Sequence, residues 1–386
     1  MKVAMTILNL DPIVNDSRVR REGAALGRAQ HEVELIAVRR SGETRIDHLD
    51  GMRLQTFELV SRRLSAGALS WFVGYMEYVL KSLLILIRRR ADVYHAHDLY
   101  ALPAAYAAAK LTRAKVIYDS HELFTERPIE GRRAWAALER LLLNRVDVVL
   151  AASEDRADFM HAHYGARPRP RVILNCPSML HRPRTRSLRS SLPGSAREKL
   201  IVVYAGAVAA SRRIEALVHA AAEFDKEAVL AIVGARSAYR TEVLEPLVAA
   251  LNLNHRVFFV DAVDSTEVVG FLSSADIGVV IYDNTCLNNF YCAPNKLFEY
   301  CMAGLAVIGC DFPAVACILR EFRVGLTFDP EIPAEVAKCV NAYAANREAL
   351  TDAKERTQVV RERYNAEREG EKLEQIYEEL VARRRG

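Results

Sequence analysis

The sequence lacks the short motifs by which several classes of enzyme are recognised. It has no G-x-x-x-x-G-K-[ST] phosphate loop, and LDPIVN (10–15) stands where a dinucleotide-binding fold would have G-x-G-x-x-G. H-E-x-x-H and C-x-x-C are also absent. The seven cysteines, five of them at irregular spacings between 286 and 317, are typical of buried free thiols. We therefore expect no metal, no cofactor and a reduced, cytoplasmic setting.

A long apolar stretch without charges is missing as well. The most apolar window, residues 64–87, is interrupted by Glu77 and Lys81. A membrane-spanning helix needs about 20 mostly apolar residues without central charges, so we expect a buried or surface-lying helix. Arginines at 62–63 and 88–90 flank the window, which leaves open a peripheral contact with the inner face of an anionic membrane. The start of the chain predicts a buried strand rather than a signal peptide.

The composition is that of a soluble globular protein with two domains. The 386 residues are 51% hydrophobic and 26% charged, which excludes general disorder and fibrous architectures. Residues 1–200 carry a net charge of +11 and residues 201–386 carry −7. This asymmetry suggests an anionic partner for one domain, but a basic surface exposed only to solvent would give the same pattern. Nucleic acid is disfavoured, because the basic residues are not interleaved with stacking aromatics.

Short β-branched segments alternate with longer amphipathic ones along the chain. Such alternation predicts parallel sheets covered by helices on both faces, and here two doubly wound, Rossmann-like α/β domains facing across a cleft. We expect domains at residues 1–178 and 200–365, a linker at 179–199, and a last helix, 366–386, that packs back on the first domain. The predicted strands are 3–8, 33–38, 93–96, 115–119, 146–151, 171–174, 200–205, 229–233, 256–260, 277–281 and 306–310.

The segment NNFYCAPNKLFEYCMAG, residues 288–304, combines an asparagine-rich loop with a short helix. Pro294 suits the first turn of this helix and Gly304 its end. The free amides of a helix N-terminus attract phosphate, and Lys296 adds a positive charge there. Glu299 shares a face with Lys296 and is able to accept two hydrogen bonds from a ribose diol. The pattern fits a nucleotide diphosphate, but an exposed ion pair has the same spacing.

Other polar side chains follow predicted strands. Arg212 comes after the strand that ends at Gly206 and could stabilise a departing diphosphate at the same place. A histidine at a strand end can donate to a sugar hydroxyl or transfer a proton. In the first half the residues at strand ends are Asn15, Asp16, Ser17, Arg18, His97, Asp98, His121 and Glu122, with Asp16 or Ser17 as a helix N-cap.

These segments resemble the retaining family 4 glycosyltransferases, which have the GT-B fold. The resemblance covers nearly the whole chain. It rests on NDSRVRREGAAL, HEVELIAV, HAHDLYALPAA and VIYDSHELF in the first half and on YAGAVAASRRIEAL in the second. The most specific piece, YCAPNKLFEYCMAGLAVIG, is similar to the subgroup with P-N-K-L-F-E-Y in its nucleotide loop.

The resemblance implies metal-independent transfer of a sugar from a nucleotide-diphospho-sugar to a hydroxyl acceptor, with retained anomeric configuration, in polysaccharide or glycoconjugate biosynthesis. It implies that His121 contacts the donor sugar, that Arg212 and Lys296 bind the diphosphate, and that Glu299 binds the ribose. The donor would also be lined by Asn288, Asn289, Tyr291, Pro294 and Asn295. The acceptor would be bordered by Asn15, Asp16, Arg18, His97, Asp98 and Glu122.

Two positions depart from the family pattern. Many members have a glutamate eight residues before the ribose-binding one, where this chain has Tyr291. Asn288, Asn289 or Asn295 would then replace its sugar contact. Relatives often have glycine after the basic residue of the diphosphate loop, where this chain has Arg213, which could alter the loop or add a charge.

Two other functions fit the same resemblance. One is a nucleotide-sugar 2-epimerase on the same fold, and the other is an inactive, membrane-associated scaffold. UDP, GDP and ADP fit the pattern equally well, and so do glycan, lipid-linked and small-molecule acceptors. The oligomeric state is open.

Overall fold

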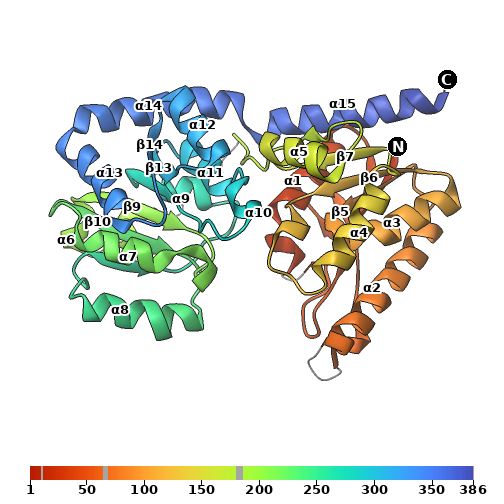
Figure 1. Ribbon diagram of the computed structural model, residues 1–386, viewed down its shortest axis with the longest axis horizontal. Coiled ribbons are helices and arrows are strands. Elements are labelled where there is room, and N and C mark those ends of the chain that lie inside the picture. The colour runs from red at the N-terminus through yellow and green to blue at the C-terminus, as the bar shows by residue number, and fades with distance from the viewer. Residues whose placement is uncertain (10–11, 64–67, 180–185, 386) are drawn as a thin grey trace. The chain divides into compact units, whose positions relative to one another are not determined.

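The computed structural model describes residues 1–9, 12–63, 68–179 and 186–385 and divides into two α/β units (Figure 1). Unit 1 consists of Met1–Asn175 with Glu367–Gly386, and unit 2 is Cys176–Ala366. The prediction of two parallel-sheet α/β domains is confirmed.

Unit 1 contains an eight-stranded sheet in the order β3-β4-β2-β1-β5-β6-β7-β8. Neighbouring strands pair in parallel, except that β3 and β4 are antiparallel. The strands are β1 (Lys2–Ile7), β2 (Glu32–Val38), β3 (His48–Leu49), β4 (Met52–Phe57), β5 (Val93–His97), β6 (Lys115–Ser120), β7 (Val148–Ala151) and β8 (Arg171–Val172).

Helices cover both faces of this sheet because side chains alternate along each strand. Met5 of β1 belongs to a buried cluster that includes Leu26 of α1 and Tyr377 of α15. Thr6, its neighbour in sequence, hydrogen-bonds Tyr78 of α2. The C-terminal helix therefore packs within unit 1. The helices are α1 (Ser17–Arg28), α2 (Ala68–Arg89), α3 (Asp98–Thr112), α4 (Arg132–Leu143), α5 (Glu154–Phe159) and α15 (Ala366–Arg385).

Unit 2 contains a six-stranded parallel sheet in the order β11-β10-β9-β12-β13-β14. Its strands are β9 (Leu200–Ala205), β10 (Ala228–Val233), β11 (Val257–Val260), β12 (Ile277–Val280), β13 (Ala306–Cys310) and β14 (Gly325–Phe328). Strands β9, β10, β12 and β13 are buried throughout, as expected of parallel strands covered on both faces.

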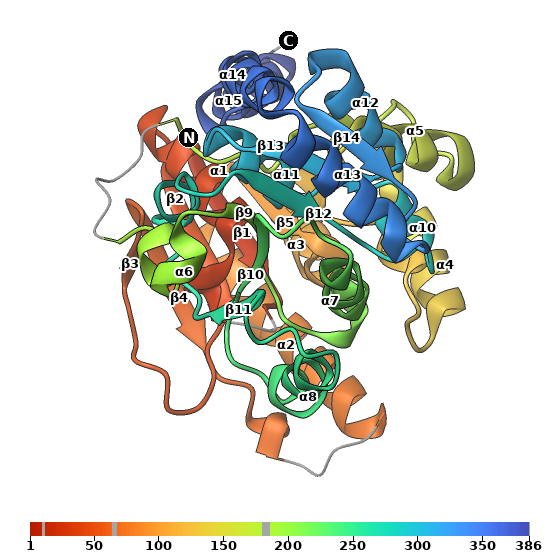
Figure 2. The same ribbon diagram turned by 90° about the vertical axis from the view of Figure 1, so that its left-hand side faces the viewer.

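Two layers of helices enclose the sheet of unit 2 (Figure 2). One face carries α7 (Ile214–Ala222), α8 (Glu245–Ala250) and α13 (Pro333–Ala345). The other carries α9 (Val268–Leu272), α11 (Asn295–Met302), α12 (Pro313–Phe322) and α14 (Arg347–Arg363). Two short helices, α6 (Gly194–Arg197) and α10 (Leu287–Phe290), complete the unit.

The segment predicted as a linker, 179–199, is largely a folded part of unit 2. Leu188, Leu192 and Ala196 are buried, and the Leu188 amide donates to the carbonyl of Phe271. These three residues are four positions apart, but the proline, serine and arginine residues around them resemble a linker, which is why the sequence predicts one here. Residues 180–185 lie outside the described part of the chain.

Candidate functional site

The first turn of α11 meets the carboxyl ends of β9 and β12. Pro294 precedes the helix and makes no side-chain cap for its free amides. The Lys296 side chain is buried, and its ammonium lies 4.2 Å from the ring centre of Tyr204 and 5.0 Å from that of Tyr282. Two aromatic faces therefore hold a cation at the positive end of a helix.

A second cation shares this place. The guanidinium carbon of Arg212 lies 5.2 Å from the ring centre of Tyr282, the ring that Lys296 also faces. Burial lowers the pKa of Lys296 to about 7, and the charge of Arg212 acts in the same direction, whereas Glu299 opposes it. In the described part of the chain neither cation forms an ion pair with a carboxylate. The arrangement suits an anionic ligand that would neutralise both.

A glycine, Gly206, follows β9 and lies beside this pair of cations. Gly206 has φ +145°, a conformation open mainly to glycine, and a Cβ there would lie 3.5 Å from Nζ of Lys296. Its amide donates to the carbonyl of Val233 on β10. Gly234 follows β10, and a Cβ there would lie 2.3 Å from the Gly206 carbonyl oxygen. Gly206 is therefore required by its backbone conformation, and Gly234 is required by the close approach of the two strand ends.

Arg213 does not add its charge to the pair. Its φ of +53° lies in the left-handed region, which explains why glycine also suits this position. Its guanidinium donates to the carbonyl of Pro330 (2.9 Å) and pairs with Glu331 (3.0 Å). The loop thus keeps the conformation that glycine would adopt, and the charge of Arg213 is paired with Glu331.

The asparagine-rich loop is held by a carboxylate that sequence reasoning missed. Nδ2 of Asn289 donates to Oδ1 of Asp283 (2.7 Å), and Asn288 is buried. Tyr291 packs edge-on against Phe290, with 5.1 Å between ring centres. Asp283 stands three residues after β12, where a strand-end carboxylate is a signal that could have been used. The structure brings the loop, Lys296 and Arg212 together within unit 2.

In unit 1 a buried ionic network joins α1 to the carboxyl ends of β5 and β6. Nε and Nη2 of Arg18 donate to the two carboxylate oxygens of Asp119 at 2.8 and 2.6 Å. Oδ2 of Asp119 also lies 3.0 Å from Nε2 of His121 and 3.2 Å from Nδ1 of His97. Nδ1 of His121 faces Asp98 at 3.5 Å.

These contacts keep His121 charged. Burial alone would lower its pKa, but the charges of Asp98 and Asp119 outweigh burial and raise the pKa of His121 to about 10. Burial would raise the pKa of Asp119, yet Arg18 and His121 hold it well below its usual range. For His97, burial dominates and lowers the pKa. At neutral pH the network therefore contains a protonated His121 and a neutral His97.

Two residues predicted to border the acceptor are enclosed in unit 1. Arg18 is 4% exposed and His97 is 0% exposed, so neither presents much surface to an acceptor, although their place on the acceptor side stays a prediction. Both instead hold Asp119, the partner of His121. The sequence positions of Arg18 and His97 predict the edge of the unit 1 sheet at which they lie. They do not predict whether each side chain points to solvent or into the protein.

The remaining predicted residues of unit 1 are accessible. Asn15 is exposed, and Asp16 caps α1 through a hydrogen bond from the Val19 amide, as expected. Asp98 is partly exposed, and its φ of +64° is unusual for aspartate. Glu122 is paired with Arg127. Asn15, Asp16, Asp98 and Glu122 thus stay candidates for the acceptor side.

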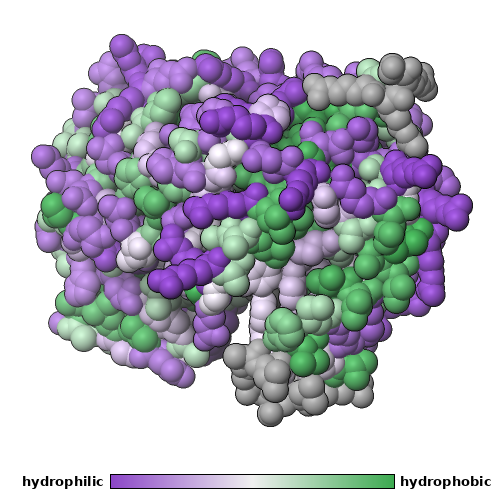
Figure 3. All heavy atoms as spheres, turned by 45° about the vertical axis from the view of Figure 1, so that its right-hand side comes forward, coloured by the Kyte–Doolittle hydropathy of each residue, from purple (hydrophilic) through white to green (hydrophobic). Residues whose placement is uncertain are grey.

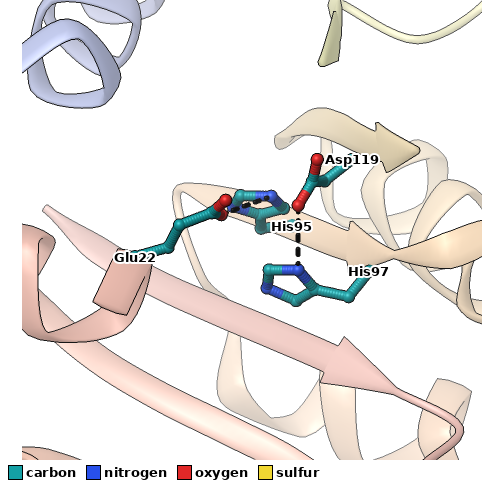
Figure 4. Close-up of side chains that lie close together, drawn as sticks. All are labelled: Glu22, His95, His97 and Asp119. Atoms are coloured by element: carbon teal, nitrogen blue, oxygen red, sulfur yellow. Dashed lines mark hydrogen bonds and ion pairs between the residues drawn. The ribbon is translucent and has the colours of Figure 1, made fainter. Parts of the chain in front are cut away.

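Glu22 and His95 extend the network into a group of four donors. Atoms of Glu22, His95, His97 and Asp119 lie within 4.8 Å of one another (Figure 4). Such residues are able to hold a metal ion. However, Nε of Arg18 lies 3.0 Å from Glu22 and the same guanidinium pairs with Asp119, so a positive charge already occupies this position. The absence of a metal remains a prediction.

Comparison with known proteins identifies the two units. The family described as "Glycosyl transferase 4-like domain" matches residues 16–176, and "Glycosyl transferases group 1" matches residues 199–346. A comparison with curated proteins found no match.

Solved structures of similar fold include several enzymes of sugar metabolism. Sucrose-phosphate synthase from Thermosynechococcus elongatus has a TM-score of 0.78 at 18% identity, with 99% of each chain covered. Anabaena HepE in complex with UDP-glucose has 0.75 at 16%, covering 98% of this chain and 100% of that one. The UDP-forming α,α-trehalose-phosphate synthase from Burkholderia vietnamiensis has 0.69 at 11%, with 99% of each chain covered. The chain therefore belongs to the glycosyltransferases, with a GT-B fold that joins a glycosyl transferase 4-like domain to a group 1 domain.

Proposed function

We propose that this protein transfers a sugar from a nucleotide-diphospho-sugar to a hydroxyl acceptor with retention of anomeric configuration and without a metal ion. The observation that carries the proposal is the pair Lys296 and Arg212, which share the Tyr282 ring beside the N-terminus of α11. Two cations and free helix amides at one strand edge match the charge of a diphosphate. UDP is the first donor nucleotide to test, because the similar HepE structure holds UDP-glucose.

The cations would act most strongly on the leaving group. When the bond between the anomeric carbon and the diphosphate oxygen breaks, negative charge grows on the diphosphate. Lys296, Arg212 and the α11 amides would stabilise that charge more in the transition state than in the bound donor. The acceptor oxygen would attack from the same face, and its proton would pass to the departing phosphate oxygen.

Protonated His121 would serve as a hydrogen-bond donor to the sugar. A histidine whose pKa is raised to about 10 carries its proton at neutral pH and is a poor general base. Asp119 pairs with Nε2 at 3.0 Å and orients the ring, whereas Nδ1, 3.5 Å from Asp98, would be the nitrogen that donates to the sugar. Arg18 and His97 would act through Asp119 as positioning residues.

Glu299 is proposed to bind the ribose. It lies one turn after Lys296 on α11, and its charge reaches that ammonium. The asparagine-rich loop, held by Asp283, is proposed to line the donor sugar in place of the glutamate that Tyr291 replaces.

The test is a product analysis with UDP-sugars as donors and a panel of hydroxyl acceptors. We expect UDP and a glycoside of unchanged anomeric configuration, formed equally well with a metal chelator present. Inverted product would overturn retention, and loss of activity in chelator would overturn metal independence. An epimerised nucleotide sugar formed without acceptor would favour the epimerase instead. UDP binding without turnover of any donor would favour the inactive scaffold.

A further inference from the structure

Helix α2 of unit 1 is packed against the protein along only one side. Tyr78, Ser82 and Leu86 are fully buried. The hydroxyls of Tyr78 and Thr6 are 3.1 Å apart, and the hydroxyl of Tyr94 donates to the Leu86 carbonyl. In the described part of the chain, Ser70–Arg89 is the one helix segment long and apolar enough to cross a membrane, and most of it is not buried in the protein.

The two charges in the middle of this helix, Glu77 and Lys81, are directed to the protein. Glu77 accepts hydrogen bonds from the amides of Val60 and Ser61. Nζ of Lys81 lies 2.6 Å from Glu77 and donates to the carbonyl of Glu58. Both charges are therefore neutralised at one flank and leave the outward face apolar.

Large apolar side chains fill that outward face (Figure 3). Residues four apart lie on one side of a helix, and this stripe runs over several turns. A soluble monomer rarely exposes a continuous apolar surface of this size. Its members are Trp71, Phe72, Val73, Met76, Leu80 and Leu84, which are 39–55% exposed.

Basic residues gather at the far end of the same helix. Arg88, Arg89 and Arg90 are exposed and come shortly before β5, although Arg89 also pairs with Glu34 at 3.0 Å. Lys110 and Arg113, at the end of α3, are exposed and lead into β6, the parallel neighbour of β5. These five cations therefore share the edge of the sheet at which the parallel strands begin. An apolar helix face bordered by cations matches the interface of an anionic bilayer.

We infer that α2 docks this protein on an anionic lipid bilayer, with its outward apolar face in the interfacial layer and the five cations at the headgroups. The helix lies along the surface and does not span the membrane. Its buried side packs on α3 and hydrogen-bonds β1, so lipid cannot surround it in the folded protein.

The first turns of α2 connect this surface to the candidate acceptor side. The ring centre of Trp71 lies 5.7 Å from that of Tyr100 and 6.0 Å from that of Trp135. Tyr100 follows Asp98 by two residues on α3. If the proposed transfer reaction holds, the bilayer would present the acceptor beside Asp98, so we infer an acceptor with a lipid anchor.

Vesicle flotation of the full chain tests the docking. We compare vesicles of phosphatidylcholine alone with vesicles that also contain phosphatidylglycerol, in the absence of nucleotide. The wild type should float with the anionic vesicles, and added salt should weaken binding. The variant Leu80→Ser/Leu84→Ser should lower the partition coefficient by about tenfold or more. The matched control Leu141→Ser/Val359→Ser changes two equally exposed residues on other helices and should bind as the wild type does.

Fluorescence gives a second readout, because Trp71 and Trp135 are the two tryptophans of the chain. Brominated anionic lipid should quench the wild type, and Trp71→Phe should lose most of the quenching. Failure of the wild type to bind, or equal binding by the Leu80/Leu84 variant, would overturn the inference. A lipid-free dimer that this variant dissociates would also overturn it, since a second copy would then cover α2.

Thermal unfolding with UDP separates the two proposals. Retained UDP stabilisation without vesicle binding would contradict the docking alone. Vesicle binding without UDP stabilisation would contradict the proposed donor instead.

Discussion

The ammonium of Lys296 lies over the face of Tyr204, 4.2 Å from the ring centre, and burial lowers the pKa of this lysine to about 7. A buried cation that faces aromatic rings, lies close to a second cation and has no ion-paired carboxylate among the described residues is costly unless a ligand supplies negative charge. The position of Lys296 thus links the fold of unit 2 to the proposed donor.

Removing this charge should impair catalysis without unfolding the chain. We expect Lys296→Met, which keeps the apolar stem over the rings, to lower kcat/KM for the donor by about tenfold or more. Steady-state kinetics with varied donor gives the comparison. Lys338→Met, an exposed lysine of the same unit, is the control and should leave kcat/KM unchanged. Equal kinetics for wild type and Lys296→Met would remove this lysine from the site.

Binding of UDP should take up protons above neutral pH. The free enzyme holds a partly deprotonated Lys296 because its pKa is about 7, and a bound diphosphate would raise that pKa. At about pH 8 we expect proton uptake, measured as a dependence of the binding enthalpy on the ionisation enthalpy of the buffer. Lys296→Met should abolish this dependence. The same uptake in the variant would assign the proton to another group.

Gly206→Ala should cost both stability and binding. A non-glycine residue at φ +145° is strained by about 1–3 kcal/mol, and the new Cβ would lie 3.5 Å from the Lys296 ammonium. Urea unfolding and UDP titration measure the two effects. Gly27→Ala is the control, because it lies within α1 with open space around its Cβ, and we expect it to stabilise by about 0.5–1 kcal/mol. Full UDP affinity in Gly206→Ala would show that the ligand does not need the backbone conformation of Gly206.

The charge on His121 should make stability fall as pH rises. Its pKa rises from 6.5 in the unfolded chain to about 10 in the folded one, so its contribution is complete below pH 6.5 and is lost as pH rises toward 10. His121→Asn should therefore lose most stability relative to wild type at low pH, and the difference should shrink as the pH is raised. Urea unfolding at several pH values on both sides of neutrality gives this difference. A difference that stays constant with pH would mean that the pKa of His121 is the same in the folded and the unfolded chain.

The sequence predicts the central strands well because they are continuous apolar runs. It misses β3, β4 and β14, and the reason is their position at or next to the edge of each sheet. β4 lies next to the edge of the unit 1 sheet and carries Arg53 and Gln55 between its buried residues. β14 is a four-residue edge strand with a single buried residue. Edge positions bury one face or less, so their sequences resemble loops.

Some residues of the candidate site can be predicted from the local sequence, and others cannot. The helix that begins after Pro294 is a local signal, so Lys296 and Glu299 were placed on the correct turn. The pairing of Arg18 with Asp119 joins residues 101 positions apart, and nothing local encodes it. The position of these residues at strand ends therefore predicts that they lie near His121. It does not predict which of them are buried, such as Arg18, and which are partly exposed, such as Asp98.

Thermal unfolding of the full chain with and without UDP, in the presence of a metal chelator, tests the central claim most directly. A ligand that binds the native state alone stabilises it by about 2.7 kcal/mol at a hundredfold excess over Kd. We predict a rise of this order for the wild type and a much smaller one for Lys296→Met and Arg212→Met. No rise with UDP or any other nucleoside diphosphate, or an equal rise in both variants, would contradict the account.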